Sequence, residues 1–321
     1  MVEIKKRSLF LIISLVVFAC SETPVEKREN IVTPKYVLVK TPKVNADSVF
    51  SFVKKQVDFG PRTPNSIAHA KCADWLVAKL SNYGLLVKEQ TGTQFAHDGV
   101  DLNYRNIIAR SDLKLAKRIL LTAHWDTRPW ADQDNQNQEE AIDGANDGGS
   151  GVAVILEVAR LLKEQVPNVG VDIVFFDIED YGKTTESFCY GSQIWAKETM
   201  LDSLKPIYGI NLDMVGDANA VFVYEGYSSQ YARPILDKVW AVAKHSGNGR
   251  FFRSIQDGMI TDDHYYVNQA GIPCIDIIHR DPQTGGFAHS WHTHNDNLQN
   301  ISKNTLKAVA EVVIQTVYRE K

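Results

Sequence analysis

Cysteine is scarce in this chain, with 4 residues among 321, and no two of them have the CxxC spacing of thiolate metal sites. The three cysteines that follow Cys20 are Cys72, Cys189 and Cys274, which cannot all pair with one another. A disulfide scaffold is therefore excluded. Cys72 and Cys274 lie in apolar patterns, so we expect them to be small residues of the core.

Several motifs of common enzyme and binding classes are also missing. The sequence has no HExxH helix and no GxSxG turn, and it contains no internal repeat. The glycine-rich segment 144–151 lacks both the Lys-Ser/Thr of a phosphate loop and the GxGxxG register, which argues against a nucleotide site. The formal net charge is only −4 with acids and bases intermixed, so we expect no nucleic-acid partner.

Only one long apolar run is present, Leu9 to Ala19, and it is too short to span a membrane. Basic residues 5–7 precede it and Cys20 follows, in a stretch that resembles the lipobox of bacterial lipoproteins. We expect a lipoprotein signal peptide at 1–19, a lipidated Cys20 with a polar tether over 20–36, and one domain over 37–321. The protein would face the periplasm, with a lipid as its only membrane anchor. An ordinary cleaved leader with an incidental cysteine is the alternative.

Apolar periodicity in the remaining chain alternates between strand and helix. This order predicts a single α/β domain with a mostly parallel central sheet and helices on both faces. The expected strands are 104–110, 118–124, 171–177, 207–213 and 272–278. The expected helices are 45–57, 66–83, 152–163, 190–198, 230–245, 261–270 and 302–318, with Gly84 as a helix stop.

Imidazole and carboxylate side chains follow these apolar segments where each gives way to a loop. In open α/β sheets, the carboxyl ends of parallel strands meet at one crevice, so residues far apart in sequence can converge there. The sequence therefore predicts a zinc site. Its candidate residues are His124, Asp147, Glu179, Asp180, Asp213 and His292.

The individual residues leave alternatives open. Asp147 could ligate a metal or cap the following helix, and Ser150 could equally serve as that cap. Glu179 and Asp180 are adjacent and point in different directions, so one can bind metal while the other acts as a base. A carboxylate at Asp126 could orient the imidazole of His124, because the two residues alternate at a strand end.

Taken together, the segments that carry these residues resemble the zinc-dependent glutaminyl cyclases, which have the fold of the zinc aminopeptidases. The resemblance extends from about residue 45 to the C-terminus and looks most like the bacterial lipoprotein branch. It is densest in Thr-Ala-His-Trp-Asp at 122–126, Gly-Ala-Asn-Asp at 144–147, Phe-Phe-Asp-Ile-Glu-Asp at 175–180, Tyr-Gly-Ser at 190–192, Asn-Leu-Asp at 211–213, Thr-Asp-Asp-His at 261–264 and Trp-His-Thr at 291–293.

This resemblance implies a role for each candidate residue. Asp147, Asp180 and His292 would hold one zinc ion per chain. Glu179 would be the general acid/base, with Asp213 and Asp262 in a carboxylate network around it. Trp291, Trp195 and His124 would form the substrate pocket.

The chain also departs from the animal enzymes of that family. Asp180 stands where they have glutamate, and Ala123 and Val152 replace a disulfide. Thr185 falls at the offset of a second pocket tryptophan, for which Trp195 or Trp130 would have to substitute.

The activity implied is cyclisation of the N-terminal glutamine of peptides or proteins to pyroglutamate, with release of ammonia, by a monomer. A two-zinc aminopeptidase is the first rival, because His124 and Asp213 would supply a second metal site that shares Asp147. A non-catalytic peptide-binding module on the same fold is a weaker one.

Overall fold

A six-stranded sheet lies at the centre of the computed structural model, with the strand order β1-β2-β4-β3-β5-β8. Four of its strands, β4, β3, β5 and β8, run parallel to one another. Strand β2 pairs antiparallel with β4, and β1 pairs antiparallel with β2 at the edge of the sheet. The predicted α/β class with a mostly parallel sheet is confirmed. The bounds are β1 Leu86–Phe95, β2 Asp101–Arg110, β3 Arg118–His124, β4 Gly170–Phe176, β5 Tyr208–Asp213 and β8 Cys274–Ile278; a separate pair is formed by β6 Phe222–Tyr224 and β7 Phe252–Gln256.

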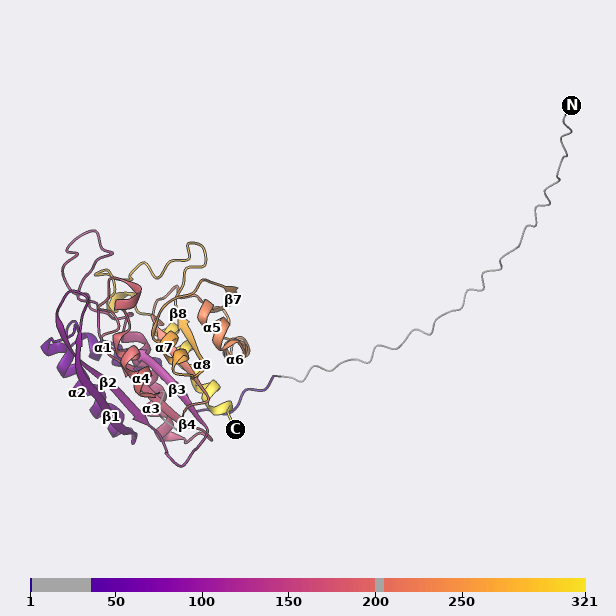
Figure 1. Cartoon of the computed structure of the whole chain (residues 1–321). Helices are drawn as coiled ribbons and strands as arrows, with labels where there is room; N and C mark the ends of the chain where they lie inside the picture. Colours follow the sequence, from indigo (N-terminus) through magenta and orange to yellow (C-terminus); the bar gives the residue numbers. More distant parts are fainter. Residues whose placement is uncertain (2–35, 200–204) are drawn as a thin grey trace. The chain divides into compact units, whose positions relative to one another are not determined.

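Helices cover both faces of this sheet (Figure 1). Helix α3 packs against β3 and β5, and α1 and α8 pack against α3; α4 packs against β2, and α7 packs against β3, β5 and β8. The bounds are α1 Ala46–Val57, α2 Ile67–Asn82, α3 Gly149–Glu164, α4 Tyr190–Thr199, α5 Gly226–Tyr231, α6 Arg233–His245, α7 Asp263–Gln269 and α8 Lys303–Arg319; short 3-10 turns lie at Thr185–Ser187 and Leu298–Asn300.

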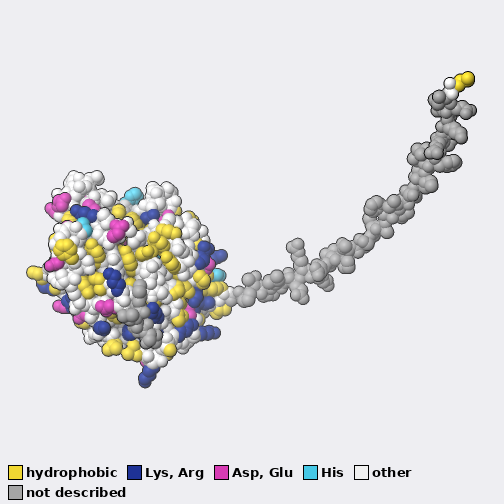
Figure 2. Space-filling view, in the orientation of Figure 1, with side chains coloured by type: hydrophobic (Ala, Val, Ile, Leu, Met, Phe, Trp, Pro, Cys, Tyr) yellow, Lys and Arg dark blue, Asp and Glu magenta, His cyan; other side chains and the backbone are white. Residues whose placement is uncertain are grey.

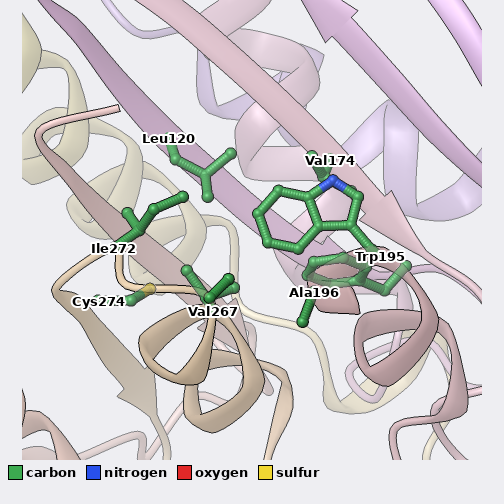
Figure 3. Close-up of a cluster of buried hydrophobic side chains, with 9 residues drawn as sticks. Leu120, Val174, Trp195, Ala196, Val267, Ile272 and Cys274 are labelled. Carbon is green, nitrogen blue, oxygen red and sulfur yellow. The ribbon is translucent and has the colours of Figure 1, made fainter. Parts of the chain in front are cut away.

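The interface between the sheet and helices α4 and α7 is a closely packed apolar cluster (Figure 3). Leu120 and Val174 project from β3 and β4 toward Trp195 of α4 and Val267 of α7. Cys274 lies in the same cluster with no exposed surface, as predicted for a core cysteine. Successive strand residues face opposite sides of the sheet, and helices cover both sides. Strands β3 and β4 are therefore buried along their whole length.

Two local predictions need correction. The single helix expected over 230–245 is divided at Ala232, because Pro234 lacks an N–H and can stand only in the first turn of a new helix, α6. Helix α3 begins after Gly148 with no side-chain cap, so neither Asp147 nor Ser150 caps it. Gly84 does follow a helix end, with the positive φ of +88° that glycine accommodates best.

The structure describes Met1, residues 36–199 and residues 205–321. The predicted signal peptide and the lipidation at Cys20 therefore lie outside the described residues. Among the described helices, none has the length and apolar character needed to cross a membrane. On the face drawn in Figure 2, acidic and basic side chains are interspersed.

Candidate active site

A cleft of about 490 Å³ opens beside the carboxyl ends of the parallel strands. The segments that follow β4, β5 and β8 supply its walls, as the topology of an open α/β sheet predicts. Asp147 and His292 reach it from two long loops. The predicted residues that line the cleft are Asp147, Glu179, Asp180, Asp213, Asp262, Trp291 and His292.

Three of these side chains form a compact donor set. Candidate ligand atoms of Asp147, Asp180 and His292 all lie within 4.8 Å of one another, and all three residues are buried. Nε2 of His292 lies 3.1 Å from Oδ1 of Asp180 and 3.7 Å from Oδ2 of Asp147. Burial lowers the pKa of His292, but the charges of Asp180 and Asp147 and the hydrogen bonds to Asp132 and Asp180 together outweigh that effect and raise the pKa to about 9.

The chemistry of this set fits zinc. One imidazole and two carboxylates are ligands that zinc takes in catalytic sites, where a fourth position stays open. Oδ2 of Asp180 is buried and has no hydrogen-bond partner among the described residues. A cation held by these atoms would satisfy that oxygen and offset the mutual repulsion of the buried carboxylates.

A second donor set lies directly beside the first and shares Asp147. Nε2 of His124 is 2.9 Å from Oδ1 of Asp147 and 3.3 Å from Oδ1 of Asp213. The two oxygens of Asp147 therefore face the two histidines separately. This arrangement is the geometric basis of the two-metal alternative.

Glu179 lies at the cleft wall with only part of its side chain accessible, and Sγ of Cys189 donates to its Oε1 at 3.0 Å. Burial raises the pKa of Glu179 well above its usual value, and the charge of Asp180 adds to this. Burial, and then the charge of Asp213, raises the pKa of Asp262 to about 6. Raised pKa values of this kind favour carboxyl groups that hold and release a proton, as acid/base catalysis requires.

Two further buried carboxylates hold the loops that carry the donors. Oδ1 and Oδ2 of Asp126 accept the backbone N–H groups of Glu179 and Asp180, each at 3.1 Å. Asp296 accepts those of Asn146 and Asp147 at 2.6 and 3.0 Å. Each carboxylate thus fixes the backbone of one acidic metal-ligand candidate. Asp126 also lies 3.5 Å from Nδ1 of His124, consistent with the predicted orienting role.

The backbone around the cleft is strained. Ile178, Cys189, Met214 and His292 adopt positive φ angles of 48°, 59°, 47° and 54°. Such angles are uncommon for non-glycine residues and are most unfavourable for a β-branched residue such as Ile178. Strain of this kind clusters at functional sites, where the surrounding contacts maintain it.

The aromatic wall of the cleft differs from the prediction in part. Trp291 lines it and stacks on the imidazole of His292, with ring centroids 3.9 Å apart. The other aromatic residues of the wall are Phe188 and Phe287. Sequence reasoning missed both, because a phenylalanine in a loop carries no signal of its own.

Two predicted pocket residues do not line the cleft. Trp195 packs against Phe176 in the core cluster under α4, since its indole lies on the inner face of that helix. His124 is only 2% exposed and lies beneath the cleft, where it is held by Asp147 and Asp213. The structure therefore does not bring Trp195 and His124 to the wall of the cleft, where the resemblance implied that they would lie.

Arg128 is another site residue that the sequence did not reveal. Its guanidinium binds both oxygens of Asp132 at 2.8 and 2.7 Å and donates to the backbone oxygen of Asp180 at 3.1 Å. Oδ1 of Asp132 lies 3.4 Å from Nδ1 of His292. Arg128 and Asp132 thus connect two of the metal-ligand candidates behind the cleft.

A mostly parallel α/β sheet with buried imidazole and carboxylate donors at its carboxyl edge defines a metal-dependent enzyme. The chain belongs to peptidase family M28, whose model matches residues 106–317. Solved relatives include a glutaminyl cyclase of Bacteroides thetaiotaomicron bound to N-acetylhistamine, 46% identical with a TM-score of 0.85, covering 88% of this chain and 100% of that one.

Two other structures extend this comparison. The Porphyromonas gingivalis glutaminyl cyclase is 48% identical, with a TM-score of 0.83 and coverage of 85% of this chain and 97% of that one. A zinc-dependent exopeptidase of Parabacteroides distasonis is 44% identical, with a TM-score of 0.85 and coverage of 88% and 100%. The family and this neighbour imply zinc.

Among curated proteins, aminopeptidase YwaD of Bacillus subtilis is 27% identical over 80% of this chain. The chain spans 54% of the length of that relative.

Proposed function

We propose that the protein is a glutaminyl-peptide cyclotransferase with one zinc ion per chain. One observation carries the proposal: the donor set Asp147, Asp180 and His292 and the acid/base candidate Glu179 line a single cleft with the indole of Trp291. The near-complete coverage of two glutaminyl cyclases at 46% and 48% identity supports the same activity.

The reaction is an intramolecular displacement. The α-amine of an N-terminal glutamine attacks its own γ-carboxamide carbon, the new C–N bond closes the pyroglutamyl ring, and ammonia leaves. Glu179 takes the proton from the amine and delivers it to the departing nitrogen. When bound to Asp147, Asp180 and His292, zinc supplies a Lewis acid for the amide oxygen. The cleft walls hold the side chain curled, which brings the two reacting atoms together.

Asp262 and Asp213 support this proton transfer. Both carboxyl groups line the cleft, and the side-chain amide of Asn211 donates to Oδ2 of Asp262 at 2.8 Å. Raised pKa values of Asp213 and Asp262, caused first by burial, favour a shared proton near Glu179. The charge of Asp262 contributes to the raised pKa of Glu179, so the protonation of these two groups is coupled.

A two-zinc aminopeptidase is the second candidate. It is favoured by the second donor set, His124, Asp147 and Asp213, whose candidate ligand atoms also lie within 4.8 Å of one another. In that case His124 and Asp213 would hold a second zinc ion with the shared Asp147, the two ions would supply Lewis-acid activation, and hydrolysis of the first peptide bond would release the first residue as a free amino acid.

The decisive experiment incubates the zinc-loaded protein with a Gln-Ala peptide and its Leu-Ala counterpart, and follows both by mass spectrometry. We expect the glutaminyl peptide to lose one ammonia with its chain intact, and the leucyl peptide to remain unchanged. Elemental analysis should give one zinc per chain, and a chelator should abolish turnover. Release of free leucine by a protein with two tightly bound zinc ions would assign the aminopeptidase activity instead.

We further infer that the protein acts as a monomer on peptides or proteins that begin with glutamine. Its lipid anchor at Cys20 would hold it on the periplasmic side of a bacterial membrane, because a basic start, an apolar run and a cysteine occur in that order.

A further inference from the structure

A second cavity adjoins the cleft and contains negative charge. Its volume is about 600 Å³, and Asp217, His279 and Asp281 line it. Phe287 lines both spaces. At the end of β8, Ile278 lines the cleft while His279, the next residue, lines the second cavity, so the same stretch of backbone separates them. We refer to this second space as the acidic cavity.

Neither carboxylate of the acidic cavity is paired with a cation among the described residues. Asp217 and Asp281 are half-buried and accept local backbone N–H groups, for example from Gln283 to Asp281 at 2.8 Å. No lysine or arginine within residues 36–199 and 205–321 lines the cavity. The neighbouring Arg280 binds Oδ2 of Asp257 at 2.7 Å instead. Apart from the imidazoles of His279 and His289, the ionisable side chains of its lining are therefore the two carboxylates.

His279 gives an independent indication that the acidic cavity takes a polar ligand. This residue is 7% exposed, and its Nδ1 has no hydrogen-bond partner in the described part of the chain. Burial lowers the pKa of His279, so at neutral pH its imidazole is uncharged and does not cancel the carboxylates. Buried polar atoms without partners are rare in folded proteins and call for an occupant.

We propose that the acidic cavity is a subsite for the lysine or arginine side chain of a peptide substrate, at the second or third residue. This inference rests on the proposed function, in which the N-terminal glutamine occupies the cleft. An extended chain advances by roughly 3.5 Å per residue, so the residues after the glutamine can reach the acidic cavity across the wall that Ile278, His279 and Phe287 form. A long cationic side chain matches both the volume and the charge of that space.

The test compares three peptides, Gln-Arg-Ala, Gln-Ala-Ala and Gln-Glu-Ala, as substrates of the zinc-loaded protein. We expect kcat/KM to fall in that order, with the difference mainly in KM. Each half-buried carboxylate should contribute about two- to fivefold between the arginyl and alanyl peptides. Added salt should reduce the preference, because it screens partly exposed charges.

Matched variants assign the preference to the cavity. Asp217→Asn and Asp281→Asn should each lower the arginyl preference, and Asp281→Lys should favour the glutamyl peptide. Asp237→Asn, which removes the same charge from an exposed helix position paired with Arg233, should leave the ratios unchanged. Thermal unfolding of each variant checks that it is folded.

The results distinguish a failure of the proposed subsite from a failure of the proposed cyclase activity. Equal kcat/KM for all three peptides, or an unchanged preference in folded Asp281→Lys, would overturn the subsite while turnover of Gln-Ala-Ala still supports the cyclase. No cyclisation of any glutaminyl peptide by the zinc-loaded wild type would overturn the proposed function itself.

Discussion

Replacing Asp296 with asparagine tests whether a residue that touches no substrate controls the metal site. Its two carboxylate oxygens accept the backbone N–H groups of Asn146 and Asp147 at 2.6 and 3.0 Å, and its side chain is almost fully buried. Asp296 follows His292 by four residues, so it joins the loops of two metal-ligand candidates. The Asp296→Asn variant keeps the shape but replaces one acceptor with an NH₂ donor.

The magnitude follows from the lost contact. One buried backbone N–H would face another donor, and a buried donor without an acceptor costs about 1–3 kcal/mol. A cost of this size agrees with the roughly 10–100-fold loss of metal affinity that is usual when a residue supporting a metal ligand is changed. We expect the variant to bind zinc about 10–100-fold more weakly, and its metal-free form to lose about 1–3 kcal/mol of unfolding free energy.

The assay is a competition titration with a zinc chelator, together with urea unfolding of the metal-free protein. Asp134→Asn is the matched control, because Oδ2 of Asp134 accepts the backbone N–H of His294 at 2.9 Å on the same loop but is accessible to water. The control should retain wild-type zinc affinity. If Asp296→Asn also retains it, the proposed hold on the Asp147 loop is refuted.

Three further predictions concern other parts of the protein. Glu179→Gln should keep its zinc while kcat falls roughly 10²–10⁴-fold, the usual worth of a positioned acid/base, whereas Asp180→Ala should lose the metal; elemental analysis and single-turnover rates check this, and a nearly normal rate in the Glu179 variant would mean that the two roles are exchanged. Glu225 is buried, and although burial raises its pKa, hydrogen bonds from His264 and from backbone N–H groups lower it to about 2. Because the folded pKa lies below the ordinary value, Glu225 stabilises the protein above about pH 4.5 by about 3 kcal/mol, and this contribution is lost as pH falls toward 2. Urea unfolding of Glu225→Gln should therefore show a deficit at neutral pH that shrinks in acid, and a deficit independent of pH would contradict the assignment. Cys20→Ser should abolish metabolic labelling with palmitate, and a mature N-terminus at another residue, found by mass spectrometry, would reduce the segment to an ordinary leader.

The predicted strands at 118–124 and 207–213 agree with the structure within one residue, because fully buried strands of a parallel sheet form continuous apolar runs. The edge strand β1 was missed. Its sequence is mostly polar and its side chains are largely exposed, so only its pairing with β2 makes it a strand. Strands β6 and β7 were missed because they are short: β6 consists of three buried residues and β7 of five that are mostly exposed, and their mutual pairing makes them strands.

The sequence by itself determined the donor types and their place in the chain. Carboxylates and imidazoles at the ends of apolar segments are brought together by an open α/β sheet, so six candidate residues could be named in advance, and the resemblance to the glutaminyl cyclases singled out Asp147, Asp180 and His292 among them. The aromatic contribution of Trp291 could also be foreseen, because it adjoins a predicted ligand.

Only the tertiary structure decided which surroundings those donors receive. It placed Trp195 in the core and brought Phe188 and Phe287 to the cleft, because the orientation of a helix or loop depends on what packs against it. It also gave Asp296 its role, since a carboxylate that accepts N–H groups from a loop about 150 positions away has no local signature. Contacts between segments that are distant in sequence form only when the sheet and its helices pack together. The periodicity of the sequence indicates which residues are buried, but not which residues they contact.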